Sequence, residues 1–291
     1  MGYFIVCWKF SDRLIAASFP AHVTADFAHW GLPSPENVTL TNGSIRLAAW
    51  YFENPRRVGC GVVEIHGFGG NRAQVLVASP LFWLRGCDLL LYDLRSHGAS
   101  SVSPLTYGVF DELDALVAVD WLSARMKLPH TSIGIIGWSY GAAVALQAAK
   151  ARQDLAFVVA DASFSSMRDI AADQAVKMYG RWAMVFIPGA LAISGWRAGF
   201  DPAQASPVDA VKDLTTPVLL IHSVTDRFTP FWQSEKIDAY SDHDHTWLLP
   251  SRWGAPHAKS YETNPTEYTR WVDAFLTKFA PTFGSRDMGR R

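Results

Sequence analysis

Short apolar segments with the composition of buried strands alternate with helical stretches along most of this sequence. The expected strands are residues 38–40, 45–52, 61–65, 88–92, 132–136, 156–160, 217–222 and 246–249. Helical stretches fall within residues 105–126, 142–152 and 265–279. Apolar strands that are separated by helices form parallel sheets that are covered on both faces. The pattern predicts an α/β fold with a mainly parallel, eight-stranded sheet and helices on both faces.

An antiparallel edge is expected at the start of this sheet. Asn42-Gly43 separates the first two strands, and this dipeptide is a strong signal for a two-residue hairpin turn. In open sheets with parallel strands, active-site groups lie just beyond the carboxyl ends of the strands. The residues that follow each strand are therefore the first candidates for chemistry.

One segment breaks the alternation. Residues 164–212 contain no good strand, and residues 182–196 contain no charged side chain. This stretch is too short to span a bilayer. We interpret it as a small helical cap over the sheet, with an ordinary core helix broken at Pro188-Gly189 as the alternative. The expected division is a core of residues 31–163 and 213–291, a cap of residues 164–212 and an N-terminal segment of residues 1–30.

The N-terminal segment has the pattern of an amphipathic helix. An apolar stripe would share one helix face and consists of Phe4, Cys7, Trp8, Ser11, Leu14, Ile15 and Ser18. We expect this stripe to pack on the body of the protein. A helix that lies on a membrane surface, or a dimer contact, is the alternative. The protein is expected to be a monomer or a homodimer.

Charge and cysteine content exclude some classes of partner. The formal net charge of the 291-residue chain is −1, so we expect no nucleic-acid partner. Cys7, Cys60 and Cys87 are widely spaced and form no metal-binding pattern. We expect unpaired buried thiols in a reducing compartment, and hence a cytoplasmic location. No metal and no cofactor are expected.

The sequence Gly137-Trp138-Ser139-Tyr140-Gly141 follows an expected strand and precedes a helix. This is the GxSxG pattern in the context that it requires. Small residues at both glycine positions allow the strand and the helix to approach, and the sharp turn exposes the serine hydroxyl. The helix N-terminus also stabilises a developing anion. The pattern predicts that Ser139 is a nucleophile.

A serine hydroxyl needs a base and a group that orients the base. His257 follows the last expected strand, and Asp226 follows the strand at 217–222. The order Ser139, Asp226, His257 is the order of an α/β-hydrolase triad. Asp161, at the end of another strand, is the alternative acid. The other histidines have the pattern of structural or surface residues.

The tetrahedral intermediate of acyl transfer needs hydrogen-bond donors. We expect the backbone N–H groups of Tyr140 and Phe68 to serve, because Phe68 lies in the glycine-rich stretch HGFGGN after the strand at 61–65. Candidates for the substrate pocket are aromatic residues near these groups or in the cap: Phe68, Trp138, Tyr140, Trp182 and Phe186.

Together these motifs resemble the α/β-hydrolase superfamily over residues 38–279. The resemblance rests on HGFGGN (66–71), YDLRSHGAS (92–100), GWSYGA (137–142) and the loops that bear Asp226 and His257. PHAKSY (256–261) is similar to the histidine loop of the Bem46-like branch. Ser96 and Ser223 stand where glycine is common in the superfamily. The resemblance implies a structural role for the 92–100 loop.

These features predict a cofactor-free serine hydrolase that cleaves small carboxylic esters or thioesters through an acyl-enzyme on Ser139. GWSYG also recurs in peptidases of the prolyl-oligopeptidase type, so a peptidase or amidase is the first alternative. A non-catalytic binding protein on a hydrolase scaffold is the second.

Overall fold

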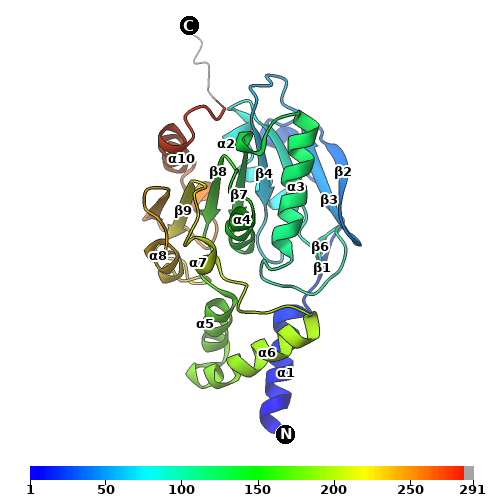
Figure 1. The fold of residues 1–291 in the computed structure, drawn as a ribbon, viewed down its shortest axis with the longest axis vertical. Coiled ribbons are helices and arrows are strands. Elements are labelled where there is room, and N and C mark those ends of the chain that lie inside the picture. The colour runs from blue at the N-terminus through cyan, green and yellow to red at the C-terminus, as the bar shows by residue number, and fades with distance from the viewer. Residues whose placement is uncertain (285–291) are drawn as a thin grey trace.

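A computed structural model describes residues 1–284, and its centre is an eight-stranded sheet (Figure 1). The strand order is β10-β9-β8-β7-β4-β5-β3-β2. All neighbours pair in parallel except β2 with β3 and β3 with β5, which pair antiparallel. The bounds are β2 Glu36–Asn42, β3 Ile45–Phe52, β4 Gly61–Ile65, β5 Asp88–Tyr92, β7 Ile133–Trp138, β8 Phe157–Asp161, β9 Val218–Ser223 and β10 Thr246–Ser251. The predicted α/β-hydrolase sheet with its antiparallel edge is confirmed.

Helices cover both faces of the sheet and create two apolar layers. One layer packs against α3 (Asp111–Met126), α4 (Tyr140–Ala151), α7 (Pro207–Ala210) and α8 (Trp232–Ala239). The other packs against α2 (Pro80–Trp83) and α10 (Pro265–Phe279). Short elements complete the core: η1 Ala28–Trp30, η2 Arg72–Val77, η3 His130–Ser132 and α9 Ser260–Thr263.

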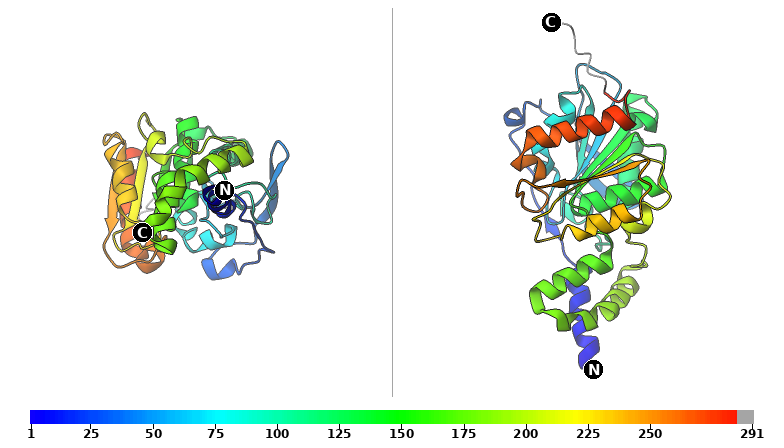
Figure 2. Two further views of the ribbon diagram at one scale, coloured as in Figure 1. Left: turned by 90° about the horizontal axis from the view of Figure 1, so that it is seen from below. Right: turned by 90° about the vertical axis from the view of Figure 1, so that its left-hand side faces the viewer.

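A small helical group lies at one end of the molecule, below the sheet in Figure 1. It consists of α5 (Met167–Tyr179), η4 (Arg181–Phe186) and α6 (Ile187–Ala198). The N-terminal helix α1 (Gly2–Ile15) lies beside α6 in both views of Figure 2. The contact is close, because a Cβ atom added at Gly189 of α6 would lie 2.6 Å from Cys7 Sγ. The helix therefore packs on the inserted segment, and we call α1, α5, η4 and α6 together the cap.

A second sheet of two short strands ties the N-terminal segment to the core. β1 (Phe19–Pro20) pairs in parallel with β6 (His97–Gly98). Neither strand was expected, because two residues carry no periodic pattern. Phe19 is thereby fixed next to the loop that follows β4.

The expectation of three unpaired thiols is wrong for two of them. Cys60 and Cys87 form a disulfide, whereas Cys7 is free and buried. The reason lies in the strand register. Gly61 pairs with Asp88 at the start of the parallel strands β4 and β5, so the cysteines that precede these residues face one another, with Cα atoms 4.6 Å apart. In residues 1–284, no helix is long and apolar enough to cross a membrane.

Candidate active site

Ser139 lies at a strained turn between β7 and α4. Its φ of +53° and ψ of −112° place it in a region that non-glycine residues rarely occupy. The flanking glycines make the turn possible: a Cβ atom at Gly137 would lie 2.2 Å from Gly141 O, and one at Gly141 would lie 2.3 Å from Ile65 O. The turn presents the Ser139 side chain at the carboxyl edge of the sheet.

Two other sheet-edge loops bring His257 and Asp226 to this serine. His257 Nε2 lies 2.7 Å from Ser139 Oγ. On the other side of the ring, His257 Nδ1 lies 2.6 Å from Asp226 Oδ2. The structure thus places the three predicted residues in one hydrogen-bonded chain. The alternative acid, Asp161, lies at the end of β8, and the Nδ1 bond of His257 goes to Asp226.

Asp226 is held as a carboxylate by several donors. Burial alone would raise its pKa, but the hydrogen bonds from His222 and His257 outweigh burial and hold the pKa of Asp226 below its ordinary value. Its other oxygen, Oδ1, accepts the backbone N–H groups of Phe228 at 2.7 Å and Thr229 at 3.0 Å. Asp226 is therefore ionised at neutral pH and fixed in orientation.

His222 is a neighbour of this group that the sequence did not single out. Its Nε2 lies 3.3 Å from Asp226 Oδ2 and 2.8 Å from Thr229 O, and its Nδ1 lies 2.6 Å from Ser234 Oγ. The signal for its role was its position at the carboxyl end of β9, four residues before Asp226. The pattern of a structural histidine is consistent with this buried position.

The glycine-rich loop after β4 packs against histidines of the core. Gly69 N–H donates to His97 Nε2 at 3.1 Å, and Leu94 N–H donates to His66 Nε2 at 3.0 Å. Burial, with a smaller contribution from His97, lowers the pKa of His66 to about 3, so His66 stays neutral and can accept this bond. Phe19 packs edge-on against Phe68, with ring centroids 4.8 Å apart.

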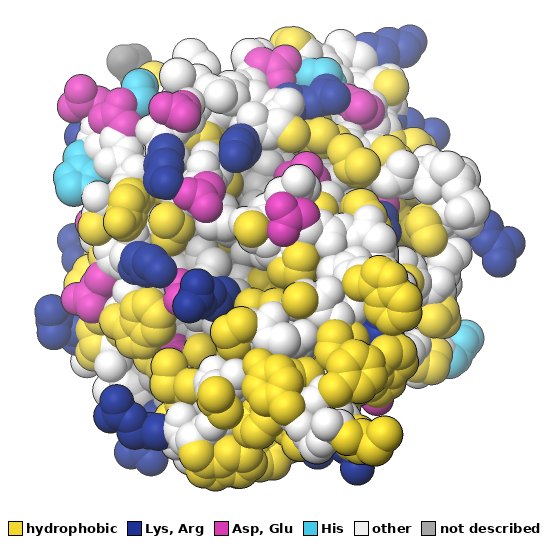
Figure 3. All heavy atoms as spheres, turned by 60° about the horizontal axis from the view of Figure 1, so that its bottom comes forward, with side chains coloured by type: hydrophobic (Ala, Val, Ile, Leu, Met, Phe, Trp, Pro, Cys, Tyr) yellow, Lys and Arg dark blue, Asp and Glu magenta, His cyan; other side chains and the backbone are white. Residues whose placement is uncertain are grey.

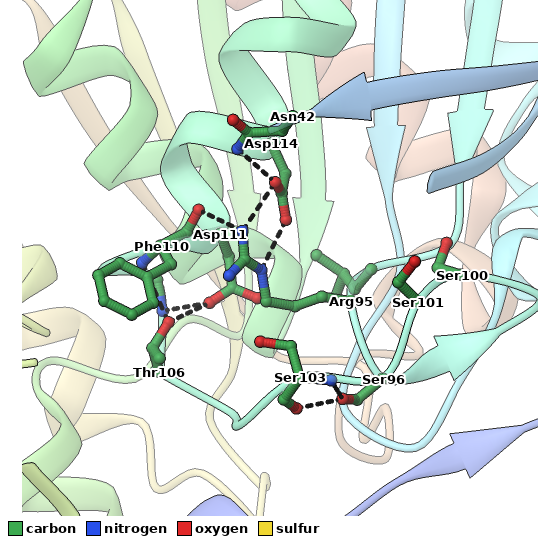
Figure 4. A network of polar contacts seen from close by, with 12 residues as sticks. Asn42, Arg95, Ser96, Ser100, Ser101, Ser103, Thr106, Phe110, Asp111 and Asp114 are labelled. Atoms are coloured by element: carbon green, nitrogen blue, oxygen red, sulfur yellow. Dashed lines mark hydrogen bonds and ion pairs between the residues drawn. The ribbon is translucent and has the colours of Figure 1, made fainter. Parts of the chain in front are cut away.

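The loop at residues 92–100 anchors this arrangement. Arg72 donates its backbone N–H to Asp93 and also forms an ion pair with that carboxylate. Figure 4 shows the second anchor, in which Arg95 reaches Asp114 of α3 through Nε at 2.7 Å and Nη2 at 2.8 Å. Asn42 donates to the same carboxylate. These contacts agree with the structural role that the resemblance implies for this loop.

The Tyr140 side chain points into the core. Its hydroxyl accepts the Tyr107 N–H at 2.8 Å and donates to Asp111 Oδ2 at 3.2 Å. These bonds fix the residue directly after Ser139. Tyr140 is also the first residue of α4, so its own N–H has no partner within the helix.

An apolar cavity of about 230 Å³ begins at Ser139 and extends under the cap. The core contributes Phe68, Tyr107, Tyr140, Phe164, Phe228 and Thr229 to its lining, and α5 and α6 contribute Ile170, Ala171, Gln174, Ala175, Met178, Tyr179 and Ile187. The N-terminal helix supplies Phe10, Arg13 and Leu14. We call it the cap cavity. Sequence reasoning missed the part played by α1, because a wall built from residues so far apart in sequence leaves no local pattern.

A second cavity, of about 280 Å³, lies on the other side of Ser139. Its lining includes Trp138, Phe68 and His257, and also the polar side chains Gln74, Lys259 and Glu262. We call it the polar cavity. Three of the predicted pocket residues, Phe68, Trp138 and Tyr140, thus line one or both cavities. Trp182 and Phe186 line neither, and Trp182 is 62% exposed on the outside of the cap.

Among residues 1–284, no group of His, Cys, Asp or Glu side chains has an arrangement that could hold a metal ion.

Two bacterial proteins are similar to this chain in sequence. YqkD of Bacillus subtilis, an uncharacterized protein, is 29% identical over 218 residues, which are 74% of this chain and 70% of YqkD. YfhR of Salmonella typhimurium, also uncharacterized, is 28% identical over 220 residues, 71% of this chain and 70% of YfhR. Neither relative carries a stated activity.

Two solved structures share the fold. A Pyrococcus furiosus esterase superposes with a TM-score of 0.73 at 20% identity, over 90% of this chain and 99% of the esterase. An acylaminoacyl peptidase of Pyrococcus horikoshii gives a TM-score of 0.66 at 18% identity, over 91% of this chain and 44% of the peptidase. The sequence profile of the prolyl oligopeptidase family matches residues 105–280. The chain therefore belongs to the prolyl oligopeptidase family, within the α/β-hydrolase superfamily of serine hydrolases.

Proposed function

We propose that the protein hydrolyses carboxylic esters or thioesters with an apolar acyl group, through an acyl-enzyme on Ser139. The observation that carries this proposal is the 2.7 Å contact between Ser139 Oγ and His257 Nε2 at a strained strand-to-helix turn. A hydroxyl in this contact can lose its proton to the imidazole as it attacks.

The steps follow from the order of the contacts. His257 takes the proton of Ser139 Oγ as the Oγ–acyl bond forms, and the resulting imidazolium is stabilised by the ionised Asp226. The imidazolium then gives the proton to the leaving alcohol or thiol as the original acyl bond breaks. A water molecule loses a proton to His257 and attacks the acyl-enzyme, and Ser139 recovers its proton when the acid leaves.

Donors for the developing oxyanion are proposed on both sides of Ser139. One is the Tyr140 N–H, which has no partner within α4. The other is the Phe68 N–H, because in the described chain the next two N–H groups of its loop are already used: Gly69 donates to His97 and Gly70 donates to Gly67 O. Each such donor contributes about 3 kcal/mol to transition-state stabilisation.

The two cavities support an ester rather than a peptide as the substrate. The cap cavity is lined mainly by apolar side chains, and Arg13 is the one charged residue in its lining among residues 1–284. It suits an alkyl or aryl chain and offers few partners for the N–H and C=O groups of a peptide. The polar cavity, with Gln74, Lys259 and Glu262 in its lining, suits a polar leaving group.

A peptidase or amidase is the second candidate, and the match to the prolyl oligopeptidase family favours it. The same three side chains would cleave an amide, with His257 protonating the amine that leaves. A non-catalytic binding role is the third candidate. It is less favoured, because it would give the contact between Ser139 Oγ and His257 Nε2 no function.

Kinetics on a graded substrate panel test the proposal. We expect kcat/KM for p-nitrophenyl esters to rise from acetate to hexanoate, by up to about fourfold for each methylene that the cap cavity buries. Ser139→Ala should abolish this turnover, and Ser103→Ala, at a half-buried serine that lines neither cavity, should leave it unchanged. Higher kcat/KM for aminoacyl p-nitroanilides than for every ester would instead establish the peptidase.

The expected cytoplasmic location does not follow from the thiols. Disulfides persist mainly in oxidising compartments, so the Cys60–Cys87 disulfide removes the argument that unpaired cysteines gave for the cytoplasm. Fractionation of the native host, with non-reducing gel analysis of each fraction, tests the location directly.

A further inference from the structure

The cap carries a large exposed apolar surface that the proposed reaction does not use. Its main members, which we call the cap face, are Tyr3, Phe4, Ile5, Trp182, Val185 and Trp196. Trp196 is 75% exposed, Val185 61% and Phe4 57%. Figure 3 shows apolar side chains gathered over this end of the molecule. Contiguous exposed apolar surface on a folded protein marks a site of interaction.

The cap face is one connected surface, because α1 joins the two parts of the inserted segment. The Tyr3 hydroxyl donates to Val185 O at 3.0 Å, and the Tyr3 and Phe186 rings stack with centroids 5.1 Å apart. At the other end of the helix contact, Trp8 packs edge-on against Trp196 at 6.2 Å. Three elements therefore present their exposed side chains together.

The charge of the cap indicates the kind of partner. Residues 1–20 and 164–200 contain six Lys and Arg side chains, three Asp and no Glu, whereas the whole chain has a net charge of −1. Asp12 pairs with Arg197 of the cap itself at 2.6 Å, and Asp169 pairs with Lys236 of α8 at 2.7 Å. These two segments therefore carry twice as many basic as acidic side chains, in addition to the exposed apolar residues of the cap face.

The exposed apolar side chains and the excess of basic residues together favour a lipid surface over a second copy of the chain as the partner. Two cap faces in a symmetric dimer would bring like charges together, which costs free energy. An anionic bilayer surface instead attracts the Lys and Arg side chains and accepts the apolar ones. Exposed Trp and Tyr side chains also prefer the level of the lipid headgroups. At 14 residues, α1 is too short to span the bilayer.

We propose that the cap face docks on the surface of an anionic lipid bilayer, with α1, η4 and α6 in contact with the headgroup region. Docking would place the mouth of the cap cavity near the lipid, since Met178 is exposed and also lines that cavity. The docking itself does not depend on the hydrolytic reaction.

Co-sedimentation of the full chain with vesicles tests the docking. We expect binding to phosphatidylglycerol vesicles that is at least about tenfold tighter than to phosphatidylcholine vesicles and that weakens with added salt, because each Lys or Arg near an anionic surface adds about fivefold in affinity. The combined variant Phe4→Gln, Val185→Gln and Trp196→Gln should lose at least about tenfold of this binding.

The matched control is the combined variant Leu84→Gln, Val102→Gln and Leu113→Gln, which alters exposed apolar side chains outside the cap. It should bind vesicles as the wild type does. Both variants should keep the thermal unfolding profile of the wild type, so that lost binding cannot arise from unfolding.

Two results would overturn the proposal. One is equal binding of the wild type and the cap-face variant to phosphatidylglycerol vesicles, or no binding by either. The other is a wild-type dimer in light scattering that the cap-face variant converts to a monomer, together with no vesicle binding. That second result would assign the cap face to a second copy of the chain.

Discussion

Replacement of Asp226 by Asn should inactivate the protein without changing its shape. Asp226 Oδ1 accepts two backbone N–H groups, and Oδ2 accepts from His257 at 2.6 Å. An asparagine side chain has only one acceptor oxygen. If that oxygen keeps the two backbone bonds, the amide NH₂ group faces His257 Nδ1, which must then act as an acceptor.

The consequence for catalysis follows from the tautomer. With Nδ1 as an acceptor, the neutral imidazole carries its proton on Nε2, the atom that lies 2.7 Å from Ser139 Oγ. His257 can then no longer take the serine proton, and no carboxylate stabilises the imidazolium. A change of this kind lowers kcat by about 10⁴-fold, which corresponds to about 5 kcal/mol in the activation free energy.

The assay is the initial rate of p-nitrophenyl butyrate hydrolysis, with Asp161→Asn as the matched control. Burial, with a smaller contribution from Asp226, raises the pKa of Asp161 to about 8, so this side chain is already neutral near pH 7 and amide replacement changes its charge little. We expect Asp161→Asn to stay within about threefold of the wild type. Full activity of Asp226→Asn, or equal losses in both variants, would refute the assignment of Asp226.

Three further predictions concern the fold and the cap cavity. Burial raises the pKa of Glu64 and of Asp161 to about 8 from ordinary values of 4.5 and 3.8. As the pH rises, the unfolded chain therefore loses these two protons before the folded chain does. The free energy of unfolding should fall between about pH 4 and pH 8, by up to about 1 kcal/mol per pH unit for each group. Glu64→Gln should reduce this slope in urea unfolding. Loss of the Cys60–Cys87 disulfide, which closes a loop with a sequence separation of 27, should cost about 3 to 4 kcal/mol in Cys60→Ala with Cys87→Ala. Ala175→Leu narrows the cap cavity, whose lining includes Ala175. It should lower kcat/KM for the p-nitrophenyl ester of octanoate by about tenfold and leave turnover of the acetate ester intact.

Each of these has a contrary outcome. If the free energy of unfolding does not change with pH, or changes with the same slope in Glu64→Gln as in the wild type, the buried carboxyl groups have partners or water in solution. Three reactive thiols in the denatured, unreduced protein would contradict the disulfide, for which only Cys7 should react. An equal loss on acetate and octanoate in Ala175→Leu would place the acyl chain elsewhere.

The core of the fold could be predicted from the sequence because its signals are local. The strands β3, β4 and β5 were predicted at their observed bounds, since runs such as residues 61–65 and 88–92 are apolar throughout and bounded by turns. Ser139 was predicted as the nucleophile in the same way, because the GxSxG turn demands glycines on both sides. The prediction of Asp226 and His257 needed one further rule, which is that residues following parallel strands meet at one edge of the sheet.

What the sequence did not reveal depends on contacts between distant segments. The place of α1 in the cap rests on the fit of Cys7 against Gly189, and no periodic pattern contains that information. The disulfide required the register of β4 against β5, which is a tertiary property. Trp182 was expected in the pocket because of its aromatic ring, but the orientation of η4 places it on the outer surface.

Covalent labelling tests the central claim most directly. The protein would be treated with a fluorophosphonate, which reacts with activated serines, and the adduct would be located by mass spectrometry of the intact chain and of its peptides. The account predicts one adduct per chain, on Ser139, that is absent in Ser139→Ala and forms at least about a thousandfold more slowly in His257→Ala. No adduct on the wild type, or an adduct that persists in Ser139→Ala, would contradict it.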